Sequence, residues 1–308
     1  HKTLRKRLSV ENSPNGGHSV VIAGKGYDLL FKKSPPEPHT ILVVGGSSGI
    51  GKEVALQYAK PGSHISIVAR NKERLEAVGK MAREKGATVT IASIDAVDAS
   101  KMREFIQKQD DSRPIDLVVA AAGFITPPNP ASYSLPDLID CIYKGNVDTC
   151  RNSVLPLVDR MRQRRRGQIC IVSSIAGLGM KNVNPIYTST KMATYAFGES
   201  LRMILEPFGV FVNIVCPGPT KTAIFDTTGT YSAGLLSAEW VAQRIVAGLR
   251  RDETVIECDM KVNLLTGFLV RDIPKLARDY LYRAFYPIAR RRGLFVVEYP
   301  SLFKEWCV

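Results

Sequence analysis

The sequence contains few of the residues that build metal sites and disulfides. Among its 308 residues, six are cysteine and four are histidine. No two cysteines form a Cys-x-x-Cys pair, and none is spaced from a histidine like a metal ligand. Several cysteines lie inside apolar runs instead. These absences predict a reduced, cytosol-facing protein without a metal site.

Long apolar runs and an even charge balance are also missing. No uninterrupted apolar segment reaches membrane-spanning length, although the chain begins at His1, so an N-terminal anchor or signal could have been removed. Only 29 acidic residues stand against 42 basic ones, which gives a net charge of +13 concentrated at both ends. No nucleic-acid recognition motif accompanies this charge. We therefore expect anionic surfaces or ligands as partners, and no nucleic acid.

A glycine-rich turn follows the first apolar run. Thr40–Val44 is typical of a buried parallel strand, and Lys52–Lys60 is typical of a helix. Between them, glycines at positions 45, 49 and 51 permit a tight turn and a close approach of backbone to a diphosphate. The helix N-terminus would add N–H groups and a positive dipole. This order predicts a dinucleotide-binding turn.

The second apolar run, Ile65–Arg70, predicts which dinucleotide binds. An acidic residue about twenty positions beyond the glycines would hold a ribose hydroxyl and select NAD. Ala69 occupies that position, and Arg70 and Arg74 could grip a 2′-phosphate. The alternative is that both are solvated surface arginines. We predict NADP(H), with Asp95 after the third strand meeting the adenine.

Strands and helices then alternate to about residue 250, and Ser237 is predicted to cap the last helix, Ala238–Arg250. This order predicts an α/β fold with a doubly wound parallel sheet in three layers, followed by a C-terminal helical extension. Ligands of such sheets bind at the carboxyl ends of the strands. The candidate positions at those ends or on the next helix are Gly45–Gly51, Arg70, Asp95, Ala122, Gly123, Ser174 and Pro217–Thr222.

Tyr187 and Lys191 lie four residues apart, and therefore on one face of a helix. Ser174 lies thirteen residues upstream, at the end of the apolar run Gln168–Val172. A phenol, an ammonium and a hydroxyl brought together can protonate a carbonyl oxygen while hydride reaches its carbon. We expect Lys191 to lower the pKa of Tyr187 toward working pH. The pair Gly145-Asn146 is predicted to interrupt a long helix from Leu138 to about residue 164. An asparagine inside a helix is unfavourable unless its amide is used.

Over residues 39–260 these motifs resemble the short-chain dehydrogenase/reductase family, whose fold is a Rossmann domain. The resemblance implies a catalytic tetrad of Asn146, Ser174, Tyr187 and Lys191, with Asn146 holding a water that links Lys191 to solvent. The chain departs from the family pattern at two places. Val44 stands where the family usually has Thr, and Ala120-Ala121-Ala122-Gly123 stands where it usually has Asn-Asn-Ala-Gly. Neither removes a reacting group. The residues implied to bind NADPH are Gly45, Ser47, Ser48, Gly49, Ile50, Gly51, Arg70, Arg74, Asp95, Ala122, Gly123, Tyr187, Lys191, Pro217, Gly218, Thr220 and Thr222.

Three further segments, namely the N-terminal arm, a loop after Thr222 and the C-terminal extension, concern the substrate and how it reaches the site. Residues 1–38 are predicted to be a flexible basic arm. The uncharged stretch from Ile224 to Leu236, Asp226 excepted, is predicted to be a lid over a hydrophobic ketone. Residues 261–308 form a basic amphipathic extension that suits an anionic membrane surface. The alternative is a helix packed on the domain or on a subunit of a homo-oligomer.

Within the family, the turn at Gly45–Gly49 and the run Val68–Asn71 look similar to 3-ketosphinganine reductases. Those are NADPH enzymes of sphingolipid synthesis at the endoplasmic reticulum membrane. The resemblance therefore implies that location, on its cytosolic face, or otherwise the cytoplasm. Two alternatives stay open: a steroid, retinoid or other carbonyl reductase of the same family, and a non-catalytic NADP-binding interaction protein.

Overall fold

The computed structural model describes residues 10–12, 18–20, 34–178, 184–222 and 235–258. The chain divides into two compact units, residues 1–34 and 35–308. In the first unit, β1 (Val10–Asn12) and β2 (His18–Val20) pair in antiparallel fashion. The predicted lid is described only at its last two residues, and the C-terminal extension lies outside the described residues.

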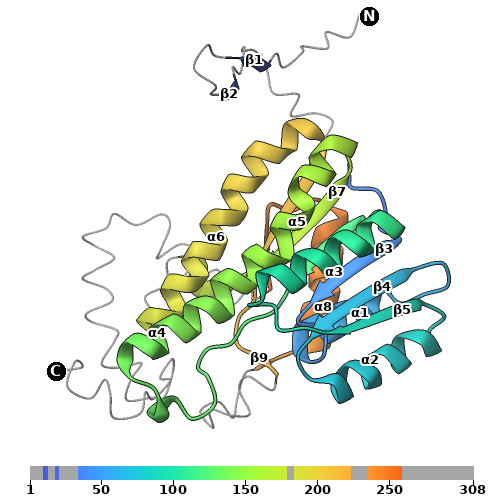
Figure 1. The fold of residues 1–308 in the computed structure, drawn as a ribbon. Helices are drawn as coiled ribbons and strands as arrows, with labels where there is room; N and C mark the ends of the chain where they lie inside the picture. Colours follow the sequence, from blue (N-terminus) through green and yellow to red (C-terminus); the bar gives the residue numbers. More distant parts are fainter. Residues whose placement is uncertain (1–9, 13–17, 21–33, 179–183, 223–234, 259–308) are drawn as a thin grey trace, which may run out of the picture. The chain divides into compact units, whose positions relative to one another are not determined.

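The second unit is built on a parallel seven-stranded sheet (Figure 1), in the order β11-β8-β7-β6-β3-β4-β5. The chain runs outward from β3 in both directions, which confirms the doubly wound Rossmann fold. The strands are β3 (Thr40–Val44), β4 (His64–Ala69), β5 (Thr88–Ser93), β6 (Leu117–Ala120), β7 (Gly167–Val172), β8 (Val210–Cys216) and β11 (Val255–Glu257). The sequence predicted six of them; β11, at the edge, was not predicted.

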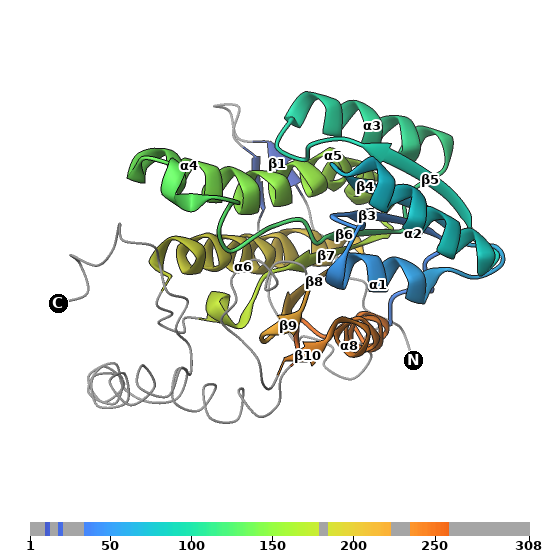
Figure 2. The same ribbon diagram turned by 90° about the horizontal axis from the view of Figure 1, so that it is seen from below.

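Helices cover both faces of the sheet, which confirms the three layers. Figure 2 shows α3, α4 and α5 on one side of the sheet and α1 and α8 on the other. The two faces have separate apolar cores, one centred on α1, α2 and α8 and the other on α3, α5 and α6. The helices are α1 (Gly49–Tyr58), α2 (Lys72–Glu84), α3 (Ala99–Ser112), α4 (Leu135–Tyr143), α5 (Thr149–Arg164), α6 (Pro185–Leu205) and α8 (Ala238–Arg250).

The central strands are buried because both of their faces are covered. Every residue of β3, β6 and β7 is buried, as expected of parallel strands between two helical layers. Their apolar runs were the strongest sequence signal, and β3 has the predicted limits. The predicted helix α8 is also confirmed in full, with Ser237 Oγ accepting from the Trp240 amide at 3.1 Å.

The long helix predicted from Leu138 to about residue 164 is interrupted. A π-helical turn, η2 (Lys144–Asp148), separates α4 from α5. It contains Gly145 and Asn146, the pair at which the sequence predicted an interruption. A Cβ at Gly145 would lie 2.1 Å from the Phe124 ring, so the turn packs against the loop that follows β6.

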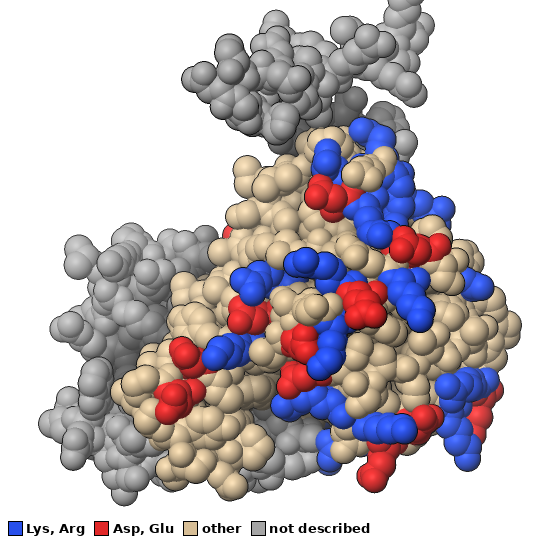
Figure 3. All heavy atoms as spheres, in the orientation of Figure 1, with Lys and Arg blue, Asp and Glu red and all other residues tan. Residues whose placement is uncertain are grey.

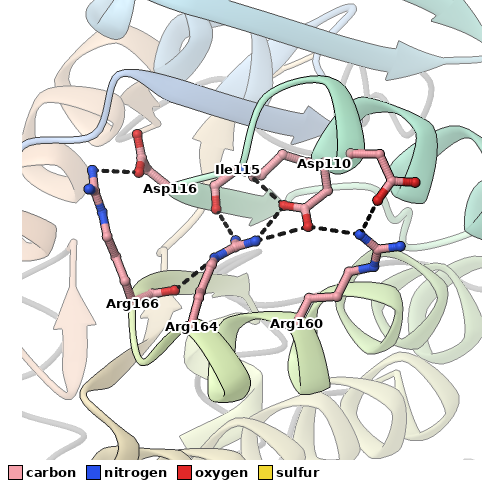
Figure 4. Close-up of polar contacts among 7 residues, drawn as sticks. Asp110, Ile115, Asp116, Arg160, Arg164 and Arg166 are labelled. Atoms are coloured by element: carbon pink, nitrogen blue, oxygen red, sulfur yellow. Dashed lines mark hydrogen bonds and ion pairs between the residues drawn. The ribbon is translucent and has the colours of Figure 1, made fainter.

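Three arginines at the end of α5, Arg160, Arg164 and Arg166, form ion pairs (Figure 4). The Asp110 carboxylate accepts from Arg164 Nη1 at 2.7 and 2.9 Å and from the Ile115 amide at 2.8 Å. Arg160 also contacts Asp110, and Arg166 pairs with Asp116 at 2.8 Å. On the face drawn in Figure 3, basic and acidic side chains lie beside one another. These ion pairs tie the end of α5 to α3 and to the start of β6, at the edge opposite the strands' carboxyl ends.

Short elements complete the unit. β9 (Thr220–Lys221) pairs with β10 (Leu236–Ser237). 3₁₀ turns occur at η1 (Pro130–Ser132), η3 (Ile175–Leu178) and η4 (Glu206–Phe208). Within the described ranges, none of the helices has both the length and the apolar character needed to cross a membrane.

Candidate active site

The glycine turn between β3 and α1 packs tightly against the loop after β6. Gly45 has φ +86°, and a Cβ there would lie 2.6 Å from the Ala122 amide nitrogen. A Cβ at Gly51 would lie 2.4 Å from the Gly45 carbonyl oxygen. Only glycine fits these positions. Ser47, Ser48 and Ile50 lie in the turn or in the first residues of the helix and are partly exposed.

The N-terminus of α1 is left open by this turn. Its N-cap residue, Ser48, makes no side-chain capping bond, so its side chain does not occupy the first N–H groups of the helix. Gly49 has φ +53°, and a Cβ there would lie 2.9 Å from Thr222 Cγ2. These backbone groups, beside the carboxyl end of β3, fit the diphosphate of a dinucleotide.

Arg70 and Arg74 are both exposed where β4 passes into α2. The Arg70 carbonyl accepts from Ser93 Oγ at 2.9 Å, and the Arg74 amide donates to Asn71 Oδ1 at 2.8 Å. Neither guanidinium forms an ion pair with a described acidic residue. Asp95 lies after β5, exposed, and its Oδ1 accepts from the Val97 amide at 3.1 Å. The three side chains are therefore accessible, as the predicted contacts with a 2′-phosphate and adenine require.

The segment after β8 borders the turn. The Pro217 carbonyl accepts from the Ile175 amide at 3.1 Å, which joins this segment to the one after β7. Thr220 Oγ1 donates to the Gly218 carbonyl at 2.9 Å. Together with the short Gly49–Thr222 approach, these bonds bring the predicted cofactor residues that follow β3 and β8 to the edge of the sheet where β7 ends.

Asn146 uses both ends of its amide. It is 1% exposed; its Oδ1 accepts from the Phe124 amide at 3.0 Å and its Nδ2 donates to the Phe124 carbonyl at 2.9 Å. A Cβ at Gly123 would lie 2.5 Å from Asn146 Oδ1 and 3.4 Å from Lys191 Nζ. The prediction that the amide is used is confirmed, and the loop after β6 thereby lies beside the lysine.

Ser174, Tyr187 and Lys191 meet between β7 and α6. The Ser174 side chain lies close enough to the Tyr187 hydroxyl to lower the pKa of the phenol. Lys191 Nζ donates to the Val172 carbonyl at 3.1 Å and lies 5.8 Å from the centroid of the Tyr187 ring. Ser174 Oγ also accepts from the Ala176 amide at 3.2 Å. The structure therefore brings the predicted hydroxyl, phenol and ammonium into one group.

The start of α6 is fixed by its N-cap. Asn184 is 0% exposed, and its Oδ1 accepts from the Tyr187 amide at 2.7 Å. One turn further, Ser189 Oγ accepts from the Tyr143 hydroxyl of α4 at 2.9 Å. These contacts, which the sequence reading missed, hold the helix that carries the phenol. The cap could have been found, because Asn184 precedes Pro185 at the first helical position.

The electrostatics of this group correct one prediction. Burial raises the pKa of Tyr187 to about 12, although its bond to Ser174 lowers it in part. Burial lowers the pKa of Lys191 to about 8. The expected lowering of the Tyr187 pKa by Lys191 is therefore wrong for the chain alone, because desolvation dominates. The phenol is protonated at neutral pH and can donate a proton.

Comparison with known proteins agrees with this geometry. The model of the short chain dehydrogenase family matches residues 39–231, so the chain belongs to that family of oxidoreductases. Bovine 3-ketodihydrosphingosine reductase is 32% identical over 215 residues, which cover 64% of this chain and 63% of the relative. Human retinol dehydrogenase 8 is 33% identical over 194 residues, 60% of each chain. The match thus spans less than two thirds of these relatives.

Solved structures share the fold. A short-chain dehydrogenase from Sphingobium yanoikuyae in complex with NADPH superimposes with a TM-score of 0.66. The match covers 85% of this chain and 96% of the other, at 21% sequence identity.

Proposed function

We propose that the chain is an NADPH-dependent reductase of a ketone on a hydrophobic, lipid-like substrate. The observation that carries the proposal is the convergence of Ser174, Tyr187 and Lys191 at the carboxyl end of β7. This edge also holds the glycine turn and the open N-terminus of α1. A hydroxyl, a phenol and an ammonium beside a dinucleotide cradle suit transfer of a hydride and a proton to a carbonyl.

The residues fit the proposed cofactor. Ser47, Ser48, Gly49 and the first amides of α1 would hold the diphosphate of NADPH, and Arg70 with Arg74 would hold its 2′-phosphate. Ala122 and Gly123, at the end of β6 between Gly45 and Asn146, would line the cofactor there. Held by these residues, NADPH would supply the hydride for the carbonyl carbon.

The side chains perform the proton transfer. The Tyr187 hydroxyl gives its proton to the carbonyl oxygen, so that hydride and proton together convert the ketone to an alcohol. The Ser174 hydroxyl donates a hydrogen bond to the same oxygen as negative charge develops there. The Lys191 ammonium stabilises the phenolate left on Tyr187, and Asn146 holds the loop after β6 beside it.

The first candidate substrate is 3-ketosphinganine, which would be reduced to sphinganine in sphingolipid synthesis. Similarity to bovine 3-ketodihydrosphingosine reductase supports this choice. Similarity to human retinol dehydrogenase 8 supports the second candidate, a retinoid or related carbonyl compound. For either lipid substrate, the proposal includes three further points. The protein acts at the cytosolic face of the endoplasmic reticulum, residues 261–308 contact an anionic membrane, and the chain assembles as a homo-oligomer.

The test is a ketone panel with purified protein and NADPH, containing 3-ketosphinganine, steroid ketones and retinal. We expect oxidation of NADPH with 3-ketosphinganine, and a loss of at least about a thousandfold in kcat for Tyr187→Phe. The matched control is Tyr58→Phe, which removes a buried phenol hydroxyl at the end of α1 that lies away from the glycine turn. Near-normal turnover by Tyr187→Phe would refute the mechanism. Absence of NADPH oxidation with every ketone would favour a non-catalytic NADP-binding interaction protein.

A further inference from the structure

Three consecutive residues at the end of β7 each contact the helix that carries the catalytic pair. The Val172 carbonyl accepts from Lys191 Nζ at 3.1 Å, and the Ser174 side chain interacts with the Tyr187 hydroxyl. Between them, Ser173 Oγ donates to the backbone carbonyl of Lys191 at 2.8 Å. The outer two contacts involve reacting groups. The middle one has no part in the mechanism above.

We propose that Ser173 is a positioning residue, whose hydroxyl fixes the backbone of Lys191 relative to Ser174. The inference rests on the proposed roles of Ser174, Tyr187 and Lys191 in ketone reduction. Ser173 is 3% exposed, and its hydroxyl bonds to a backbone carbonyl. It therefore acts through Lys191 and not on the substrate.

The contact is anchored on both sides. The Ser173 amide donates to the Val215 carbonyl of β8 at 2.8 Å, so its backbone is part of the sheet. On the helix side, Thr194 Oγ1 lies 3.1 Å from the Lys191 carbonyl and 3.4 Å from Ser173 Oγ. Thr194 is 2% exposed. A rigid strand is thus joined to α6 at the carbonyl of a catalytic residue.

Gly177 packs directly against the Ser173–Lys191 hydrogen bond. A Cβ at Gly177 would lie 2.5 Å from Ser173 Oγ and 2.8 Å from the Lys191 carbonyl oxygen. Any side chain at position 177 would displace one of the two bonded atoms. The glycine therefore lets η3 approach without breaking the Ser173–Lys191 bond.

Loss of this bond should change the protonation of Lys191 as well as the stability of the fold. The Ser173 hydroxyl holds the backbone of Lys191. If this backbone moves, the Lys191 side chain moves with it, and Nζ is drawn away from the Val172 carbonyl. That carbonyl stabilises the ammonium form. When it is withdrawn, the buried ammonium loses a partner and its pKa falls further.

The experiment compares Ser173→Ala with Ser153→Ala. Ser153 on α5 is 0% exposed, and its hydroxyl also donates to a backbone carbonyl, that of Thr149, at 2.6 Å. Both variants lose one buried hydroxyl of this kind, and we expect similar falls in melting temperature. Gly177→Ala and Thr194→Val disturb the Ser173–Lys191 bond without changing Ser173, and serve if Ser173→Ala does not fold.

Two readouts separate positioning from stability. For Ser173→Ala we expect kcat to fall about tenfold with KM changed less than about threefold, and for Ser153→Ala neither to change. The titration of Lys191, followed by NMR of ¹³C-labelled lysine and assigned with Lys191→Arg, should move to lower pH in Ser173→Ala only. Gly177→Ala should shift it in the same direction.

Equal kcat values and equal Lys191 titrations in Ser173→Ala and Ser153→Ala would overturn the inference. The NMR titration needs no substrate, so it decides the inference separately from the proposed function. If the wild-type protein reduced no ketone, the proposed function would fail. A Lys191 titration shifted in Ser173→Ala would then still support the positioning role, and an unshifted one would overturn it.

Discussion

Asn146 is bonded to the backbone of Phe124 through both ends of its side-chain amide, at 3.0 and 2.9 Å. The two residues are 22 positions apart, one in the π-helical turn between α4 and α5 and the other in the loop after β6. The amide satisfies a donor and an acceptor that would otherwise be unpaired. Asn146, a residue type that is unfavourable inside a helix, therefore holds the loop after β6 beside Lys191.

Asn146→Ala should lower both stability and catalysis. It removes two hydrogen bonds and leaves the Phe124 amide and carbonyl unpaired, which costs about 2–4 kcal/mol. We expect kcat to fall at least about tenfold, because Gly123 is no longer held beside Lys191. The control is Asn152→Ala on α5, whose Nδ2 donates to the Ala96 and Val97 carbonyls at 2.9 and 3.0 Å. Equal kcat values for the two variants at saturating NADPH would contradict the role of Asn146.

Ketone reduction should slow as the pH rises above about 8. The pKa of Lys191 is about 8, so its positive charge is present below that pH and is lost above it. The pKa of Tyr187 is about 12, so the phenol keeps its proton over the same range. The decline in kcat therefore reports loss of the charge that stabilises the phenolate. Lys191→Arg, which stays charged, should remove the decline at a lower kcat. If kcat still declined above pH 8 in Lys191→Arg, the decline would come from the titration of another group.

Arg70→Ala should weaken NADPH binding and leave NADH binding unchanged. An exposed guanidinium that grips a 2′-phosphate contributes only where that phosphate is present. We expect KM for NADPH to rise at least about tenfold, and the double variant with Arg74→Ala to rise further. Lys80→Ala on α2 is the control, since its side chain is 79% exposed and, among the described residues, pairs with Glu84 alone. Tighter binding of NADH than NADPH by the wild type would refute the preference.

The sequence predicted those parts of the fold that local patterns determine. The apolar run of β3, the glycine turn and the Ser237 cap of α8 each depend on neighbouring residues, and the structure has them as predicted. β11 was missed because three residues at a sheet edge carry little periodicity. The spacing of Tyr187 and Lys191 predicted that they share one helix face, but no local pattern indicates that Ser173 holds the Lys191 carbonyl.

The pKa of Tyr187 was predicted in the wrong direction for a physical reason. The sequence showed that a lysine lies one helical turn away. It did not show that the phenol and the ammonium are both buried, and desolvation is the largest cause of the shift in each pKa. Burial depends on elements far apart in the sequence, here β7, α6 and the segment after β8.

Asp110→Ala should destabilise the fold strongly. The Asp110 side chain is 3% exposed and binds Arg164, Arg160 and the Ile115 amide. Removing the carboxylate leaves the Arg164 guanidinium partly buried without its counter-charge, which costs about 3–5 kcal/mol. The measurement is the free energy of unfolding in urea.

Asp159→Ala is the matched control on the same helix end. Its carboxylate is 77% exposed and pairs with Arg162, which is 40% exposed, so we expect little change in stability. The double variant Asp110→Leu with Arg164→Met removes both charges and should be more stable than Asp110→Ala, since no uncompensated charge is then left in the interior. If Asp110→Ala and Asp159→Ala unfolded at the same urea concentration, the ends of α3 and α5 would be joined by apolar packing alone, and the ion pairs of Figure 4 would have no part in holding α5 to the sheet.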